Sequence, residues 1–200
     1  MLYSELQCSP AIHQAVERMG FAEMTEIQEK TIPLMLVGHD VIAKAPTGTG
    51  KTCAFGIPVV EHIQPENKYP QAVIMAPTRE LAQQIAEELT NLTYFMPEVQ
   101  VACVYGGANM EKQAKRLAEG CQIVVATPGR LMDHYKHHSI DISHVTQIVL
   151  DEADEMLNMG FYKDVRHIIE MMKARKALSM FSATISREVM DIGWLYQHNA

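Results

Sequence analysis

The sequence predicts an α/β fold: a mostly parallel, twisted sheet with helices on both faces, preceded by a short helical segment. Short apolar runs alternate with longer amphipathic segments along the chain, which is typical of strands joined by helical crossovers. Such crossovers are right-handed and return each strand parallel to its predecessor. Hydrophobic residues make up 48% of the 200 residues, which is enough to bury a sizeable core.

Residues 1–37 form the predicted helical segment, and residues 38–200 form the α/β body. Ser9 is followed by a proline, the pair that commonly caps and opens a helix. Thr25 and Gln28 have the spacing of a capping box, in which each side chain bonds the other residue's backbone amide. Two helices are therefore expected before the first strand.

Six strands and six helices are expected in the body. The strands are the apolar runs, since strands buried on both faces are apolar throughout rather than alternating; they are expected at 40–44, 71–75, 99–104, 122–126, 147–150 and 177–181. The helices are the amphipathic segments between and after them; they are expected at 51–63, 78–94, 110–118, 129–137, 162–173 and 186–196.

Charge and composition exclude several classes of protein. The net charge of −7 argues against a broad basic surface, so any nucleic-acid contact must be local. No apolar run could span a bilayer and no leader is visible, so we expect a cytoplasmic, monomeric chain without a membrane partner. The four cysteines form no Cys-x-x-Cys pair and are expected as free thiols. His134, His137 and His138 share one predicted helix, where a solvated polar face is a better interpretation than a metal site.

A glycine-containing loop follows the first predicted strand and leads into a helix that opens with Lys51 and Thr52. Glycines let backbone N–H groups turn toward phosphate oxygens, and the helix start favours an anion. Lys51 can reach the β- and γ-phosphates of a nucleoside triphosphate, and the Thr52 hydroxyl can face Mg²⁺. The alternative is a strand-to-helix turn without a ligand. The predicted nucleotide-binding loop residues are Pro46, Thr47, Gly48, Thr49 and Gly50.

Carboxylates follow the fifth predicted strand, at Asp151, Glu152 and Asp154. Ligands of open parallel sheets bind at the carboxyl ends of the strands, where the phosphate loop must also lie. Asp151 is therefore expected to hold Mg²⁺, and Glu152 to orient and deprotonate the attacking water, which makes both catalytic together with Lys51. The alternative is an acidic helix start favoured by the helix dipole alone.

Two hydroxyls end the last predicted strand, at Ser182 and Thr184. Because alternate strand residues face the same side, both can hydrogen-bond Asp154 and couple it to the state of the site. The alternative is a pair of caps for the helix that begins at Ser186.

Three strand-to-helix corners are candidates for contact with a nucleic-acid backbone. Threonine hydroxyls and free first-turn amides suit phosphate oxygens, glycines allow close approach, and an arginine in a first turn indicates an anion nearby. Ordinary capping is the alternative for each corner. The residues are Pro77, Thr78 and Arg79; Gly106 and Gly107; and Thr127, Pro128, Gly129 and Arg130.

In this order the motifs resemble the first RecA-like domain of a DEAD-box RNA helicase. The chain contains Asp-Glu-Ala-Asp, the phosphate loop in its Ala-x-Thr-Gly-x-Gly-Lys-Thr form, Pro-Thr-Arg-Glu-Leu, Gly-Gly, Thr-Pro-Gly-Arg and Ser-Ala-Thr. The leading segment resembles the family's Q motif, with Tyr3 at the position of an isolated aromatic and Met24 where proline is usual. The resemblance implies that Gln28 bonds the adenine edge and that Phe21 stacks on its face.

The resemblance also implies RNA-stimulated ATP hydrolysis and local strand separation. Both require a second RecA-like domain of the same full-length protein, which supplies arginines to the γ-phosphate and completes the clamp on the RNA backbone. No His-Arg-x-Gly-Arg string occurs in these residues, so we expect nucleotide binding, very slow hydrolysis and no unwinding from them alone.

Three other functions remain open. A DNA helicase would share these motifs, because only specific contacts sense the 2′-hydroxyl. A non-catalytic, ATP-gated binding module is disfavoured by Lys51 and Glu152. A small-molecule phosphotransferase is disfavoured by the two Thr/Pro/Arg corners.

Overall fold

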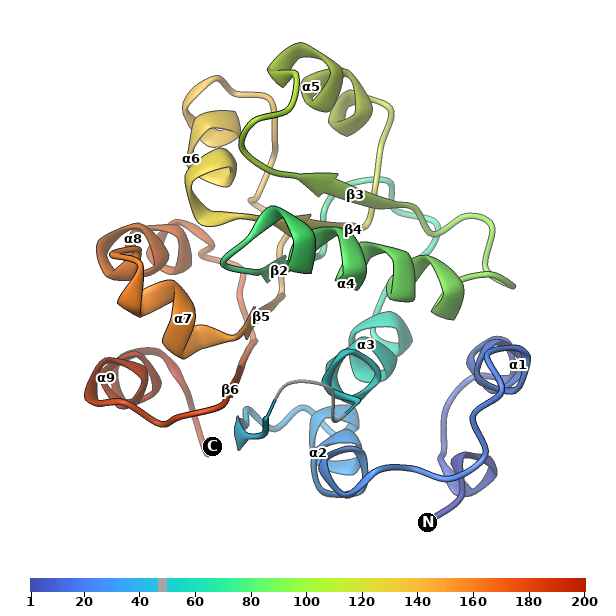
Figure 1. The fold of residues 1–200 in the computed structure, drawn as a ribbon. Coiled ribbons are helices and arrows are strands. Elements are labelled where there is room, and N and C mark those ends of the chain that lie inside the picture. The colour runs from blue at the N-terminus through green and yellow to red at the C-terminus, as the bar shows by residue number, and fades with distance from the viewer. Residues whose placement is uncertain (47–49) are drawn as a thin grey trace.

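A six-stranded parallel sheet forms the centre of the computed structural model, which describes residues 1–46 and 50–200 (Figure 1). Within these residues the strand order is β1-β6-β5-β2-β4-β3, and every neighbouring pair is parallel. The strands are β1 (Ile42–Lys44), β2 (Ala72–Met75), β3 (Val101–Val104), β4 (Ile123–Ala126), β5 (Gln147–Asp151) and β6 (Ala177–Ser182). Each lies within, or one residue beyond, the range expected for it.

Helices cover both faces of the sheet. Figure 1 shows α2, α3 and α4 on one side and α6, α7, α8 and α9 on the other. The helices are α1 (Pro10–Arg18), α2 (Glu26–Leu36), α3 (Lys51–Glu61), α4 (Arg79–Leu92), α5 (Met110–Ala118), α6 (Pro128–Lys136), α7 (Ala153–Asn158), α8 (Tyr162–Met171) and α9 (Arg187–Tyr196), with a 3₁₀ turn η1 (Tyr3–Glu5).

Side-chain alternation along the strands divides the interior into two cores. Ala72 and Ile74 of β2 belong to the core under α1–α4, whereas Val73 and Met75 belong to the core under α5–α9. All four side chains are completely buried, which explains why the strand is apolar throughout. Because apolar cores cover both faces of the sheet, polar functional groups are expected at the ends of the strands.

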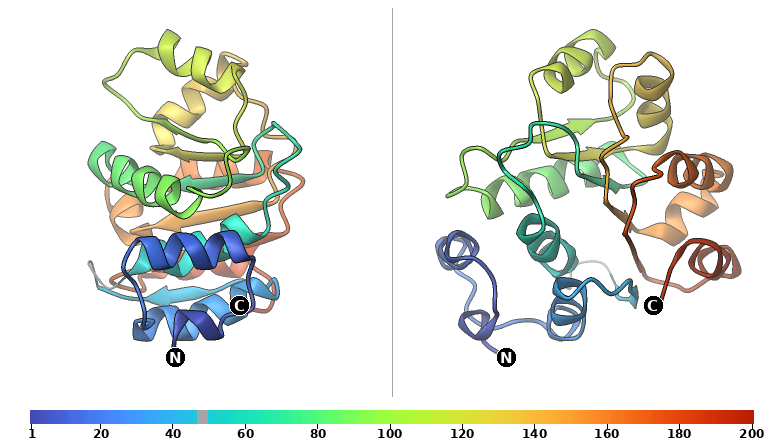
Figure 2. Two further views of the ribbon diagram at one scale, coloured as in Figure 1. Left: turned by 90° about the vertical axis from the view of Figure 1, so that its right-hand side faces the viewer. Right: turned by 180° about the vertical axis from the view of Figure 1, so that it is seen from behind.

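Helices α1 and α2 pack against the body, and their buried side chains belong to the core under α1–α4 (Figure 2). The predicted capping box is present, because Gln28 N donates to Thr25 Oγ1 at 3.4 Å and Thr25 N donates to Gln28 Oε1 at 2.9 Å. Ser9 occupies the N-cap of α1 but makes no side-chain cap bond, so the expected position is right and the expected bond is missing.

Helix α7 lies outside the six helices expected in the body. It has six residues and begins directly after Glu152, whose φ of 48° and ψ of 50° are left-handed. The acidic segment is therefore both the end of β5 and the start of α7. A ligand-binding strand end and an acidic helix start are thus compatible interpretations of it. In the described ranges no helix has the length and apolarity needed to cross a membrane.

Candidate nucleotide site and nucleic-acid edge

The parallel sheet brings the sequence motifs to one edge, because all its strands end on the same side. The segments that end or follow the strands lie along that edge in strand order: residues 45–46 at β1, 182–184 at β6, 151–154 at β5, 76–79 at β2, 127–130 at β4 and 105–108 at β3. The nucleotide motifs thus occupy one half of the edge and the candidate nucleic-acid corners the other.

Lys51 lies between two carboxylates of the acidic motif. Its Nζ is 3.4 Å from Asp151 Oδ1 and 3.9 Å from Glu152 Oε1, and the Lys51 and Asp151 side chains are only 7% and 1% exposed. Burial raises the pKa of Asp151 above its usual value, and the Lys51 ammonium opposes that shift. The end of the loop and the acidic strand end are therefore adjacent, as expected.

Glu152 turns the chain between the strand and the helix. A left-handed backbone at a residue other than glycine costs about 1–3 kcal/mol, and such residues are enriched at functional sites, although His138 and Asn199 are also left-handed here. The turn is supported by a hydrogen bond of 2.9 Å from Glu152 N to Asp151 Oδ1. As a result, Asp151 and Glu152, which are neighbours in sequence, both reach Lys51.

Glu88 is a site residue that sequence reasoning missed. It lies on α4, and its carboxylate is hydrogen-bonded to the Thr52 side chain. Burial raises the pKa of Glu88, the Thr52 bond opposes this, and the charge of Asp151 adds to it. Glu88 therefore adds a third carboxylate to the candidate site, beside Thr52. Because Glu88 belongs to a regular amphipathic helix, its sequence context gave no sign of this.

Asp154 is bonded to both hydroxyl residues after β6. Its Oδ2 accepts from Thr184 N at 3.1 Å and from Thr184 Oγ1 at 2.8 Å, and its backbone N donates to Ser182 Oγ at 3.1 Å. Burial raises the pKa of Asp154, but hydrogen bonds led by those of Thr184 outweigh it and hold the pKa below its usual value. The cap of α9 is Ser186, whose Oγ accepts from Val189 N. The bonds needed for coupling are thus present, and coupling itself stays a prediction.

Gln28 joins the N-terminal segment to the end of the phosphate loop. Its Nε2 donates to Gly50 O at 3.1 Å, and its Oε1 also accepts from the Tyr3 hydroxyl. Gly50 has a φ of 79°, and a Cβ there would lie 2.5 Å from Gln28 Nε2, so both backbone and space require glycine. Phe21 is 44% exposed and stacks on Tyr3, with ring centroids 6.2 Å apart.

Part of the predicted phosphate loop, Thr47, Gly48 and Thr49, lies outside the described residues. Pro46 is described, and it lines a cavity of about 310 Å³ together with Ala45, Thr25 and Ile27. This cavity lies where the start of the loop meets the N-terminal end of α2. The adenine contacts expected of Phe21 and Gln28 stay predictions.

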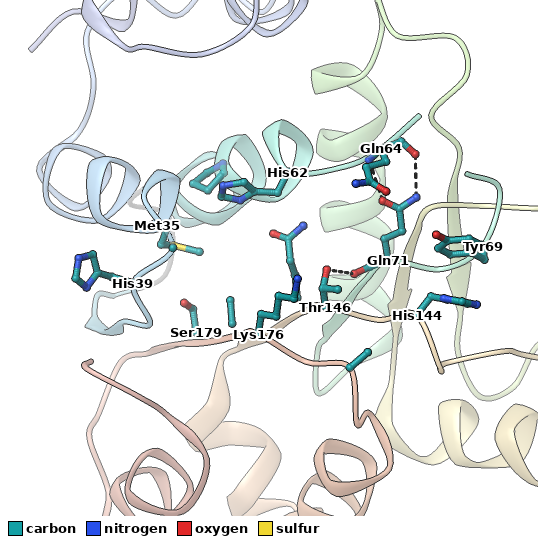
Figure 3. Close-up of a pocket in the computed structure, with 15 residues that line it drawn as sticks. Met35, His39, His62, Gln64, Tyr69, Gln71, His144, Thr146, Lys176 and Ser179 are labelled. Carbon is teal, nitrogen blue, oxygen red and sulfur yellow. Dashed lines mark hydrogen bonds between the residues drawn. The ribbon is translucent and has the colours of Figure 1, made fainter. Parts of the chain in front are cut away.

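Another cavity, of about 600 Å³, lies at the opposite edge of the sheet (Figure 3). Its lining includes Gln71, Gln147 and Ala177, at the beginnings of β2, β5 and β6. The Gln71 side chain is already bonded to the backbone of Gln64 and Asn67. None of the predicted site residues lines this cavity, so it is separate from the candidate site.

The corner after β2 combines capping with exposed groups. Thr78 Oγ1 accepts from Leu81 N at 3.2 Å, so the capping interpretation holds for this threonine. Arg79 is exposed, and its guanidinium lies 4.8 Å from the centre of the Tyr105 ring, which follows β3. A Cβ on the exposed Gly107 would lie 4.0 Å from Arg79 Nη1, so the corners after β2 and β3 adjoin.

The corner after β4 is held more firmly. Thr127 occupies the N-cap of α6 but makes no side-chain cap bond, so the position expected by the capping alternative is present and the bond is missing, and Pro128 is the first residue of α6. Arg130 Nη1 donates to Ala108 O at 3.0 Å, which ties this corner to the loop after β3.

The expectation of a solvated face for His134 is wrong, since its side chain is completely buried. Among the residues described, no group of three or more His, Cys, Asp or Glu side chains could hold a metal ion.

Comparison with known proteins gives relatives over nearly the whole chain. A family model described as DEAD/DEAH box helicase matches residues 25–192. An ATP-dependent RNA helicase CshA from Limosilactobacillus reuteri is 49% identical over 193 residues, which are 96% of this chain and 39% of that protein. An ATP-dependent RNA helicase DeaD from Mycobacterium tuberculosis is 41% identical, over 98% of this chain and 35% of that protein. The chain therefore spans well under half the length of these relatives.

Solved structures share the fold. A DEAD box protein from Methanococcus jannaschii has a TM-score of 0.91 and 40% identity, and the match covers 100% of this chain and 54% of that one. The yeast DEAD-box splicing factor Prp28 has a TM-score of 0.92 and 33% identity, and the match covers 99% of this chain and 50% of that one. The predicted RecA-like α/β fold and the resemblance are thus confirmed. Since the family model spans most of the sequence and the family's motifs line one edge of the sheet, the chain belongs to the DEAD/DEAH box helicase family.

Proposed function

We propose that the chain is the ATP-binding half of an ATP-dependent RNA helicase, which hydrolyses ATP in response to RNA and separates RNA strands locally. The observation that carries this proposal is the position of Lys51 between Asp151 and Glu152, on the same sheet edge as the exposed Thr78 and Arg79. The names of the relatives, ATP-dependent RNA helicases, support it.

The residues present fit ATP and Mg²⁺. A carboxylate and a hydroxyl, from Asp151 and Thr52, are the hard oxygen ligands that Mg²⁺ prefers. Asp151 is almost completely buried, and a buried carboxylate requires a cation beside it. Thr52 and Asp151 would hold the metal, which supplies neutralisation of phosphate charge, while Lys51 and the amides of the loop bind the phosphates.

The catalytic residues divide the work among them. Lys51 binds and orients the terminal phosphates, where its positive charge stabilises the developing negative charge. Glu152 orients the attacking water and accepts its proton. Asp154, bonded to Thr184, is the group through which we expect the nucleotide state to reach the rest of the edge.

The other half of the edge is proposed to contact the RNA backbone. Contacts to phosphate and sugar carry no direct sequence information, so we expect binding that does not depend on sequence. The full protein is expected to add a second RecA-like domain, which closes over the RNA and supplies arginines to the γ-phosphate. We further propose a cytoplasmic location and a monomeric domain.

Hydrolysis assays on this chain and on the longer protein test the proposal. The 200-residue chain should bind ATP yet turn it over very slowly with or without RNA, and the longer protein should be stimulated by RNA. Robust RNA-stimulated turnover by the chain alone would contradict the requirement for a second domain. Equal competition by matched RNA and DNA strands would favour a general nucleic-acid helicase instead.

A further inference from the structure

We propose that Gln113 is a positioning residue that fixes Arg130 and the loop after β3 as one RNA-facing surface. Gln113 lies on α5, outside every motif identified from the sequence, and is 8% exposed. The inference rests on the proposed function, because it assumes that this half of the edge contacts the RNA backbone.

The Gln113 side chain joins three separate elements. Its Nε2 donates to Tyr105 O, in the loop after β3, at 3.0 Å. Its Oε1 accepts from Arg130 Nη1 at 3.1 Å and from His134 Nε2 at 3.0 Å, both on α6. A side-chain amide offers two acceptor sites and two donors, so one residue satisfies all three partners.

The orientation of this amide follows from the chemistry of its neighbours. Arginine can only donate and a backbone carbonyl can only accept, so the oxygen must face Arg130 and the nitrogen must face Tyr105 O. His134 must then donate from Nε2. Burial lowers the pKa of His134 and the charge of Arg130 lowers it further, which favours this neutral form. A neutral imidazole adds no second positive charge beside Arg130, whose guanidinium also faces the half-exposed Asp133 carboxylate.

The bonds of Arg130 fix its guanidinium from one side. Both Nη1 hydrogens are used, by Ala108 O and by Gln113 Oε1, and Nε lies 3.7 Å from Asp133 Oδ2. Within the described ranges Nη2 donates to no acceptor and, unlike Nε, it is not completely buried, although the Arg130 side chain as a whole is only 13% exposed. The accessible nitrogen is thus held in place by an interior network, ready to meet a phosphate.

The same network positions the glycine loop. Gln113 holds Tyr105 O and Arg130 holds Ala108 O, so both ends of the segment that contains Gly106 and Gly107 are fixed. Glycines are flexible in themselves, and a close backbone approach to RNA requires that they be held. Loss of Gln113 would therefore release the arginine and the loop together.

The test measures RNA affinity in the 200-residue chain by fluorescence anisotropy with a labelled single-stranded RNA at low salt. Gln113→Met keeps the length of the side chain but removes every hydrogen bond, and we expect it to weaken RNA binding about tenfold. The slope of log affinity against log salt should fall by about 1, as for one lost phosphate contact. ATP affinity, measured by calorimetry, should not change.

A double-mutant cycle separates positioning from general stability. Arg130→Ala should weaken RNA binding as much as Gln113→Met, and the double variant should bind no more weakly than Arg130→Ala alone. Gln14→Leu, at an exposed glutamine of α1, is the matched control and should bind as wild type. Gln113→Leu repeats the cycle if Gln113→Met does not fold.

The possible outcomes distinguish the positioning role of Gln113 from the proposed function of the chain. Wild-type RNA affinity in Gln113→Met, additive losses in the double variant, or an unchanged salt slope would overturn the positioning role and leave the proposed function standing. An equal loss of ATP affinity would show a merely structural role and would also overturn it. If the wild-type chain binds RNA too weakly to measure, the same variants are compared in the longer protein, and absence of RNA binding there as well would refute both claims.

Discussion

The two halves of the sheet edge use opposite designs. After β1, β6 and β5, charged groups are buried and paired with one another, as in Lys51 with Asp151. After β2 and β3, the groups are exposed, as in Arg79, which lies over the Tyr105 ring, and Gly107, whose loop is bonded at Tyr105 O and Ala108 O. The comparison leads us to expect that the proposed nucleotide half is an all-or-none site, whereas the proposed nucleic-acid half is a set of graded contacts.

Removal of the buried cation should have the largest effect. Lys51→Ala leaves Asp151 buried without its partner, and breaking a buried pair costs about 3–5 kcal/mol. We expect ATP binding to be abolished in calorimetry and the free energy of unfolding to fall. Lys163→Ala, at an exposed lysine, is the control. Unchanged ATP affinity in Lys51→Ala would contradict the proposal that the buried half of the edge is an all-or-none nucleotide site.

Removal of the proposed base should separate binding from chemistry. Glu152→Gln keeps the shape of the side chain, so ATP affinity should persist, while turnover of the full-length protein should fall at least about 100-fold. Glu155→Gln, at an exposed carboxylate of α7, should leave turnover intact. Persistent turnover in Glu152→Gln would remove the assigned role.

The pH dependence of stability should report on Asp154. Its pKa is held below the usual value in the folded chain, so its ionised form stabilises the fold above about pH 4, and the gain is lost as pH falls through the folded pKa. Asp154→Asn should lower the free energy of unfolding by about 1.5–3 kcal/mol at pH 7 in urea titrations. The difference in free energy of unfolding between wild type and Asp154→Asn should become smaller toward pH 3. Asp191→Asn, at an exposed aspartate, should be as stable as wild type. A difference for Asp154→Asn that did not vary with pH would show that it does not come from ionisation of Asp154.

The smallest effect is expected in the exposed half. Arg79→Ala removes one cation from the proposed RNA-contacting half of the edge, so RNA affinity should fall a few-fold and the slope of log affinity against log salt by about 1. Arg18→Ala is a matched control, since Arg18 also lies over an aromatic ring, 3.6 Å from the centre of Tyr94. Equal losses in the two variants would mean that Arg79 acts through folding rather than contact.

The sequence was a good guide wherever local pattern decides structure. Runs such as residues 72–75 are apolar because both faces of the sheet are covered, and α5 has the predicted bounds, 110–118. Because every strand is parallel, strand ends become neighbours, so motifs found far apart in sequence could be grouped.

Features that depend on long-range pairing could not be predicted. Helix α7 is short and follows a left-handed turn at Glu152, which no local rule for non-glycine residues favours. Glu88, Gln113 and His134 are polar residues on amphipathic helices, where a solvated position is the usual outcome. Only the folded chain shows that Glu88 meets Thr52 and that Gln113 meets Arg130.

The division of the edge into two halves is tested most directly by amide chemical shifts of the 200-residue chain, titrated first with Mg-ATP and then with single-stranded RNA. The account predicts that Mg-ATP shifts the amides of residues 50–52, 151–154 and 182–184, and that RNA shifts the amides of residues 78–79, 105–108, 127 and 129–130. Shifts from either ligand concentrated instead at the opposite edge, around Gln71, His144 and Lys176, would contradict it.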